Sequence, residues 1–137
     1  EDASITLDRA GYGLSCGGIS ASLRDMARFG LMLLNNGQTE GRQVIPAAWC
    51  QDIRHGAHGL YDPDNYKMWP NGAYRNQFWV EDSQLGRHYC FGVFGQMVMV
   101  APDTGMMVVK LSSWPDFVDS SYFRLTMAGL KAVEAAL

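Results

Sequence analysis

The fold is decided by "HYCFGVFGQMVMVAPDTGMMVVKLSS" (residues 88–113), in which two apolar runs flank a tight turn. Residues 88–101 and 106–113 are rich in Val, Met and aromatic side chains, which is typical of β-strands. Pro102-Asp103-Thr104-Gly105 between them predicts a hairpin, with Gly105 free to adopt a positive φ. Neither run alternates cleanly between apolar and polar residues, so we expect both faces of this sheet to be covered.

Gly92 and Gly95 interrupt the first of these runs. A glycine inside a strand loses packing and costs chain entropy, so it usually marks a bulge or a place where another backbone or a ligand comes close. The pattern therefore predicts a close approach at residues 92–95.

The N-terminal half of the chain predicts two helices. Ser22 and Asp25 have the spacing of a capping box that opens a helix, and Gly37 suits its left-handed C-terminal cap. A shorter helix is expected from Pro46, as its first-turn residue, to about Arg54. The first helix has one apolar face, formed by Leu23, Met26, Ala27, Gly30, Leu33 and Leu34.

The C-terminal half predicts one more strand and a closing helix. Residues 73–80 read as a strand, and a helix is expected from about Asp119. Its apolar stripe, which we expect to cover one face of the sheet, consists of Phe123, Met127, Leu130, Val133 and Leu137. The expected fold is α+β, with an antiparallel sheet of about three strands, two N-terminal helices, and a C-terminal helix packed on the sheet.

Composition excludes two classes of partner. The chain has 137 residues, 47% of them hydrophobic, and a formal charge of −3, as in a single soluble globular domain. Its eleven basic residues are scattered, which argues against a nucleic-acid partner, and no apolar segment is long enough to cross a membrane.

The chain has three cysteines, Cys16, Cys50 and Cys90, an odd number at irregular spacing. We therefore expect reduced thiols and a cytoplasmic setting.

Two local patterns have an ordinary explanation. Gly13-Leu14-Ser15-Cys16-Gly17 satisfies G-x-S-x-G, but the segment before it is not a buried strand and the helix begins too late, so a glycine-rich turn is favoured. His55, His58 and Cys50 are metal-ligand types, yet no fourth ligand is near in sequence and we expect no metal.

Aromatic residues are concentrated in and before the predicted strands. Trp69, Tyr74, Phe78, Trp79 and Tyr89 can stack on a ligand, although aromatic residues in strands more often fill a core, which is the interpretation we adopt. His88 at the strand entrance has no acid or nucleophile fixed beside it by sequence. The chain itself supplies no complete catalytic constellation.

Four stretches of the chain, taken in order, have a recognisable form: "GGISASLRDMARFGLMLLNNG" (17–37), "YRNQFWV" (74–80), "FGQMVMVAPDTGMMVVKLS" (94–112) and the closing helix. Together they resemble the C-terminal part of serine hydrolases of the class C β-lactamase and penicillin-binding-protein-like superfamily, closest to its 6-aminohexanoate-dimer hydrolase and esterase branch. The resemblance implies a partial β-lactamase/transpeptidase-like fold. It makes 1–137 a single segment, the C-terminal portion of a larger hydrolase, in which 1–60 end the helical region and 73–137 form the sheet and the C-terminal helix.

The catalytic motifs of that superfamily are expected upstream of the matched region. Its nucleophile belongs to a Ser-x-x-Lys motif, which this chain lacks, and a Tyr-x-Asn/Ser motif helps to move the serine proton. Tyr74-Arg75-Asn76 fits the letters of the second motif, but it follows the helix that should come after that motif and leads directly into a strand. The resemblance therefore implies a hydrolase of amide or ester bonds that acts through an acyl-enzyme, of which this chain alone is inactive.

A third element of the superfamily, a Lys/His-Thr-Gly-like triplet on the strand beside the cleft, is expected in this chain. Matching the Gly-Gln that follows it to Gly95-Gln96 places the substrate-binding triplet at Cys90-Phe91-Gly92. Cys90 and Phe91 depart from the pattern and remove the cation and hydroxyl that would hold a β-lactam carboxylate. The resemblance assigns the backbone N–H of Val93 to the oxyanion hole.

The implied partners are a small-molecule amide or ester substrate and the missing N-terminal part of the same protein, without cofactor, and a homo-oligomer is compatible with this reading. Two alternatives stay open at this point. One is a non-catalytic α+β interaction module that binds through a sheet edge or an uncovered face. The other is an independent α/β-hydrolase-like enzyme that uses Ser15, which the local sequence disfavours.

Overall fold

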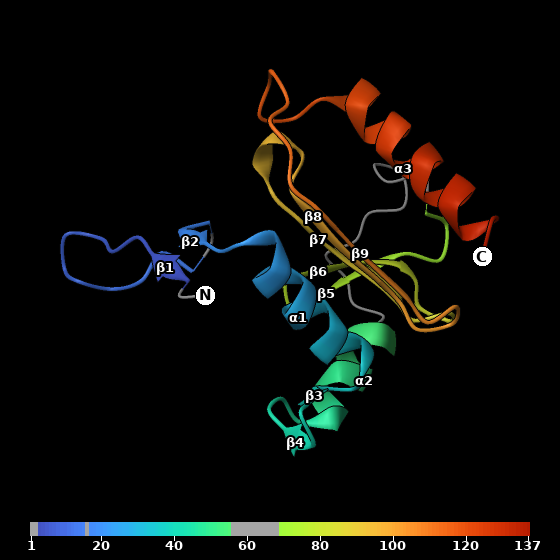
Figure 1. Ribbon diagram of the computed structural model, residues 1–137, viewed down its shortest axis with the longest axis horizontal. Helices are drawn as coiled ribbons and strands as arrows, with labels where there is room; N and C mark the ends of the chain where they lie inside the picture. The colour runs from blue at the N-terminus through green and yellow to red at the C-terminus, as the bar shows by residue number, and fades with distance from the viewer. Residues whose placement is uncertain (1–2, 16, 56–68) are drawn as a thin grey trace.

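The computed structural model describes residues 3–15, 17–55 and 69–137. Its centre is a five-stranded antiparallel sheet in the order β5-β6-β7-β8-β9. Helices α1 and α3 lie on opposite sides of this sheet, and α2 lies beside the end of α1 (Figure 1). The elements are β5 (Ala73–Arg75), β6 (Phe78–Asp82), β7 (Arg87–Phe91), β8 (Met97–Ala101), β9 (Met106–Lys110), α1 (Leu23–Leu34), α2 (Ala47–His55) and α3 (Ser120–Glu134). The α+β class and the three predicted helices are confirmed.

Two short ribbons complete the secondary structure of the described residues. β1 (Ser4–Ile5) pairs with β2 (Ile19–Ser20), and β3 (Gln38–Thr39) pairs with β4 (Arg42–Gln43). The β1–β2 ribbon and its loop project away from the sheet (Figure 1). In the part of the chain that the structure describes, no helix is long and apolar enough to cross a membrane.

The prediction of about three strands was wrong, because two of the predicted runs each contain a turn. The run 73–80 folds into the β5–β6 hairpin, whose turn residues Asn76 and Gln77 have φ values of 49° and 68°. The run 88–101 is divided by the 3₁₀ turn η1 (Val93–Gly95) into β7 and β8. The predicted hairpin at residues 102–105 is confirmed, and Gly105 has a φ of 69°.

The ends of α1 follow the predicted capping residues, with one difference. The Ser22 hydroxyl accepts the Asp25 N–H at 3.2 Å, as a cap should. The Asp25 carboxylate accepts from the Ser22 hydroxyl instead of from a backbone N–H. At the other end Gly37 has a φ of 81° and donates its N–H to Met32 O at 2.8 Å, which closes the helix.

Both faces of the sheet are buried, as its sequence predicts. On the face covered by α1, the buried core consists of Leu33, Cys50, Ile53, Phe78, Val98 and Val100. On the face covered by α3 it consists of Trp69, Tyr89, Met97, Met99, Ala101 and Met106. All five residues of β8 are buried, and alternate side chains enter the two cores.

The two helices meet the sheet differently. α1 approaches closely at Gly30, where an added Cβ would lie 2.8 Å from Met107 Sδ and 3.2 Å from a Val98 methyl. α3 has no fully buried residue and packs through half-buried Phe123, Met127 and Leu130. The remaining two residues of its predicted stripe, Val133 and Leu137, are exposed.

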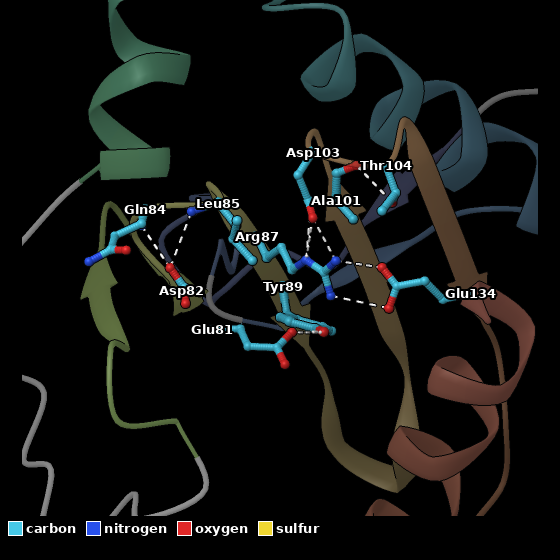
Figure 2. A network of polar contacts seen from close by, with 10 residues as sticks. All are labelled: Glu81, Asp82, Gln84, Leu85, Arg87, Tyr89, Ala101, Asp103, Thr104 and Glu134. Atoms are coloured by element: carbon cyan, nitrogen blue, oxygen red, sulfur yellow. Dashed lines mark hydrogen bonds and ion pairs between the residues drawn. The ribbon is translucent and has the colours of Figure 1, made fainter.

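Arg87 ties three elements together at one end of the sheet (Figure 2). From β7 its guanidinium donates to Asp103 in the β8–β9 turn at 2.6 Å and to Glu134 at the end of α3 at 2.5 Å. The hydrogen bond to Asp103, together with that to Glu134, outweighs desolvation and raises the pKa of Arg87. Beside it, the Tyr89 hydroxyl donates to Glu81. This network fastens the hairpin and the C-terminal helix to the middle of the sheet.

His88 should make the stability of this fold depend on pH. The ring is 1% exposed, lies 2.8 Å from Gly86 O through Nδ1, and is desolvated, which lowers its pKa from 6.5 to about 4. The unfolded chain binds a proton near pH 6.5 and the folded chain does not. The free energy of unfolding therefore falls as pH drops from 6.5 to 4, by up to about 3 kcal/mol.

Urea titrations between pH 4.5 and 7 test this prediction. His88→Asn keeps an N–H donor for Gly86 but cannot titrate, so its pH profile should be flatter than that of the native protein. His55→Asn makes the same exchange at an exposed position and provides the control for the substitution itself. Parallel profiles for the native protein and His88→Asn would show that His88 is not the source.

Candidate active-site turn

The turn between β7 and β8 has an unusual backbone. It is closed by a hydrogen bond from Gly92 N to Gln96 O at 2.9 Å. Phe94 and Gly95 follow each other in the left-handed region, with φ values of 56° and 82°. For a residue other than glycine this conformation costs about 1–2 kcal/mol. Such a backbone persists only where surrounding contacts fix it, and these positions cluster at functional sites.

Val93 presents its backbone N–H at the start of this turn. The residue is the first of η1 and is 54% exposed. Within the described residues, no backbone hydrogen bond has the Val93 N–H as its donor. The β6–β7 ladder reaches only the Trp79–Tyr89 pair in this direction, so the end of β7 emerges from it. An amide of an exposed residue that has no backbone acceptor among the described residues, placed just beyond the middle strand, is a geometry that can receive an anionic oxygen.

The predicted triplet does not form one surface. Cys90 packs with the core on the α1 side, and burial raises the pKa of its thiol to about 11, so the thiol is protonated at neutral pH. The Phe91 ring lies on the other face, stacked on Tyr89 with centroids 5.1 Å apart and edge-on to Phe123 at 5.4 Å. Gly92 carries no side chain. The roles assigned to these residues and to Val93 stay predictions.

A hollow of about 650 Å³ lies beside the turn, between the sheet and the N-terminal half of α3. Its lining is mostly aromatic and apolar, which suits an apolar group of a ligand. Of the four predicted site residues, Phe91 and Gly92 belong to the lining. The full lining is Trp69, Trp79, Phe91, Gly92, Gly95, Gln96, Met97, Trp114, Phe117, Val118, Asp119, Ser120, Phe123 and Thr126.

Sequence reasoning missed the contribution of the segment that follows β9. Trp114, Phe117 and Val118 fit no strand or helix period, yet this segment bonds to the turn: Phe94 donates to Phe117 O at 2.9 Å, and Trp114 donates to Phe94 O at 3.2 Å. The tryptophan itself, placed just beyond a strand, was the available signal. The predicted aromatic core is confirmed for Phe78, Trp69 and Tyr89, although Trp69 and Trp79 also face the hollow.

The other candidate groups do not assemble into a site. Ser15 is exposed in the loop before β2, and neither a buried strand nor a helix adjoins it. Cys16 and His58 lie outside the described residues, and His55 Nδ1 lies 2.9 Å from Ser83 O. In residues 3–15, 17–55 and 69–137, no three His, Cys, Asp or Glu side chains are placed to hold a metal ion.

Two comparisons relate this chain to known proteins. It is 36% identical over 117 residues to the 6-aminohexanoate-dimer hydrolase of Paenarthrobacter ureafaciens, a match that covers 84% of this chain. This chain is a partial homologue of that hydrolase. It also superposes, with a TM-score of 0.72 and 26% identity, on a solved structure described as "Putative 6-aminohexanoate-dimer hydrolase from Bacillus anthracis" over 95% of its own length. No family model matches the chain.

The homology confirms the resemblance inferred from the sequence, but it covers only part of each relative. The chain spans 30% of the length of the curated 6-aminohexanoate-dimer hydrolase and 32% of the length of the Bacillus anthracis chain. Catalytic activity and substrate are therefore matters for proposal.

Gly95 should be the least replaceable residue of the turn. A Cβ added there would lie 2.2 Å from Trp114 Cε2 and 2.6 Å from Ser112 Oγ, and its φ is already positive. Gly95→Ala should lower the free energy of unfolding by at least about 2–3 kcal/mol, because overpacking adds to backbone strain. The matched control is Gly105→Ala, whose φ is 69° and whose added Cβ would meet nothing within 4 Å, so only about 1 kcal/mol should be lost. Equal urea midpoints for the two variants would contradict the packing argument.

Proposed function

We propose that this chain supplies the oxyanion-hole strand of a serine hydrolase that cleaves amide or ester bonds through an acyl-enzyme. The observation that carries the proposal is the N–H of the exposed residue Val93, which has no backbone acceptor within the described residues. It stands at the end of the middle strand in a partial homologue of a hydrolase. A backbone donor does not depend on its side chain, so a valine can fill this place.

The reaction needs a nucleophile from outside these 137 residues. In the proposed mechanism the serine of a Ser-x-x-Lys motif attacks the substrate carbonyl, and its proton passes to the leaving amine or alcohol. The carbonyl oxygen becomes anionic and accepts hydrogen bonds from the Val93 N–H and from the N–H of the nucleophile. Water then hydrolyses the acyl-enzyme. Each such donor is worth about 3 kcal/mol of transition-state stabilisation.

The substrate class we propose is an amide or ester other than a β-lactam. The Cys90 thiol is half-buried and protonated and the Phe91 ring is stacked, so neither side chain offers a cation to a β-lactam carboxylate. The adjoining hollow is apolar and aromatic. The curated relative is named for a dimer of 6-aminohexanoate, which supports an amide as the scissile bond. We retain the cytoplasm as the proposed location and the rest of the protein as the proposed partner.

Removing one hydrogen atom at residue 93 tests the role of the amide. Proline suits the first position of a helical turn, and Gly92 before it is extended, with φ −116° and ψ 162°, as a residue preceding proline should be. In the full-length protein, Val93→Pro should therefore fold and lower kcat about 10²–10³-fold in steady-state ester or amide hydrolysis. Val93→Ala trims the same side chain but keeps the N–H, so its kcat should remain near that of the native enzyme. A proline variant as active as the alanine variant would remove Val93 from the oxyanion hole.

An interaction module is the second candidate, and exposed apolar residues favour it. Phe117, Val118 and Leu125, around and on α3, are each more than 60% exposed. Exposed apolar side chains of this kind suit contact with another polypeptide. Labelling with a fluorophosphonate separates the candidates: a hydrolase should be labelled in the full-length protein and not in residues 1–137 alone. A full-length protein without label and without Ser-x-x-Lys would favour the module, and label on Ser15 would instead support a nucleophile within this chain.

A further inference from the structure

The β7–β8 turn is held in place from β9 and the residues that follow it. Gly95 O accepts hydrogen bonds from Lys110 Nζ at 2.8 Å and from Ser112 Oγ at 2.7 Å. Phe94 O lies 3.0 Å from the same hydroxyl and accepts the Trp114 N–H at 3.2 Å. Both carbonyls of the left-handed residues are thus bound by one short segment.

Gln96 joins the same segment to the far side of the turn. Its Nε2 donates to Ser112 O at 2.6 Å and its Oε1 accepts from Ser112 N at 3.1 Å. This reciprocal pair joins the residue before β8 to a residue two positions after the end of β9. The turn therefore cannot move without breaking contacts to residues 110–114.

Lys110 is the charged residue among those that hold the turn, and its ammonium group donates to the backbone carbonyl of Gly95. Its Nζ also donates to Ser112 Oγ at 2.7 Å and lies 4.5 Å from the centre of the Trp114 ring. Among the described residues no carboxylate forms an ion pair with it. A charged donor makes the stronger hydrogen bond to a carbonyl, and here that carbonyl belongs to a strained turn.

We propose that Lys110 is a positioning residue for the oxyanion hole: its ammonium group, with the Ser112 hydroxyl, fixes the carbonyls of Phe94 and Gly95 and so sets the direction of the Val93 N–H. The inference rests on the proposed function, in which that N–H receives the oxyanion. The hydrogen bonds of Lys110 Nζ go to Gly95 O and Ser112 Oγ. Lys110 acts only through the shape of the turn.

The test compares three lysine variants of the full-length protein. Lys110→Met keeps most of the side-chain stem against Trp114 and removes the charge, whereas Lys110→Arg keeps a cation. Lys131→Met makes the same exchange at an exposed position of α3. Amide hydrogen exchange of Phe94 and Trp114, whose bonds hold the turn, reports its order. Hydrolysis of a p-nitrophenyl acyl ester reports kcat and KM separately.

Lys110→Met should speed exchange at Phe94 and Trp114 about tenfold or more, the loss expected for one charge-assisted hydrogen bond. It should lower kcat about tenfold to a hundredfold, as misplacement of a catalytic donor does, and change KM less than about twofold. Lys110→Arg should restore most of both values, and Lys131→Met should change neither. If Lys110→Met does not fold, Ser112→Ala, which removes only the hydroxyl, should give the same pattern with smaller changes.

The outcomes separate this inference from the proposed function. Unchanged exchange in Lys110→Met overturns the inference whatever the activity, and so does faster exchange with an unchanged kcat. A native protein that hydrolyses no ester and takes no fluorophosphonate overturns the proposed function. In that case faster exchange in Lys110→Met still supports Lys110 as the residue that fixes the turn.

Discussion

Burial of β8 on both faces is the constraint on which the other contacts depend. Every residue of this strand is buried, so it needs a helix on each side and a hydrogen-bonded strand at each edge. Val98 and Val100 require the core that α1 closes, and Met97 and Met99 require the core that α3 closes. Because β8 cannot shift by one residue without reversing both sets of side chains, the register of β7 is fixed as well. The turn that joins β7 to β8 therefore begins and ends at strands whose register is fixed.

Local sequence signals predicted the elements that have their own start and stop residues. Ser22 and Gly37 set the ends of α1, and Asp119 caps α3 by accepting the Ser121 and Tyr122 amides. The number of strands was not predictable in the same way. The β5–β6 turn uses Asn76 and Gln77 at positive φ, without the Asn-Gly pair that normally announces such a hairpin. Asn76 and Gln77 are polar, but aromatic residues lie on both sides of them, so 73–80 reads as one strand.

The sequence predicted where along the chain the site lies, but not which face of the sheet each of its residues occupies. Gly92 and Gly95 indicated a close approach, and Gly95 does meet the Trp114 ring and Ser112. The triplet Cys90-Phe91-Gly92 was predicted to line one surface. Successive side chains of a strand point to opposite faces, so Cys90 packs in one core and Phe91 in the other. The partners of the turn come from residues 110–117, about twenty positions further on, and no local period links the two segments. Long-range contacts of this kind become visible only in three dimensions.

The contacts that attach α3 to the sheet have a consequence for the hollow that lies between them. With no fully buried residue, the helix depends on three half-buried side chains and on the ion pair of Glu134 with Arg87. A partly exposed ion pair weakens as ionic strength rises, because dissolved ions screen its charges. The wall of the hollow that α3 provides therefore rests on half-buried side chains and one such ion pair, whereas the opposite wall is the hydrogen-bonded sheet.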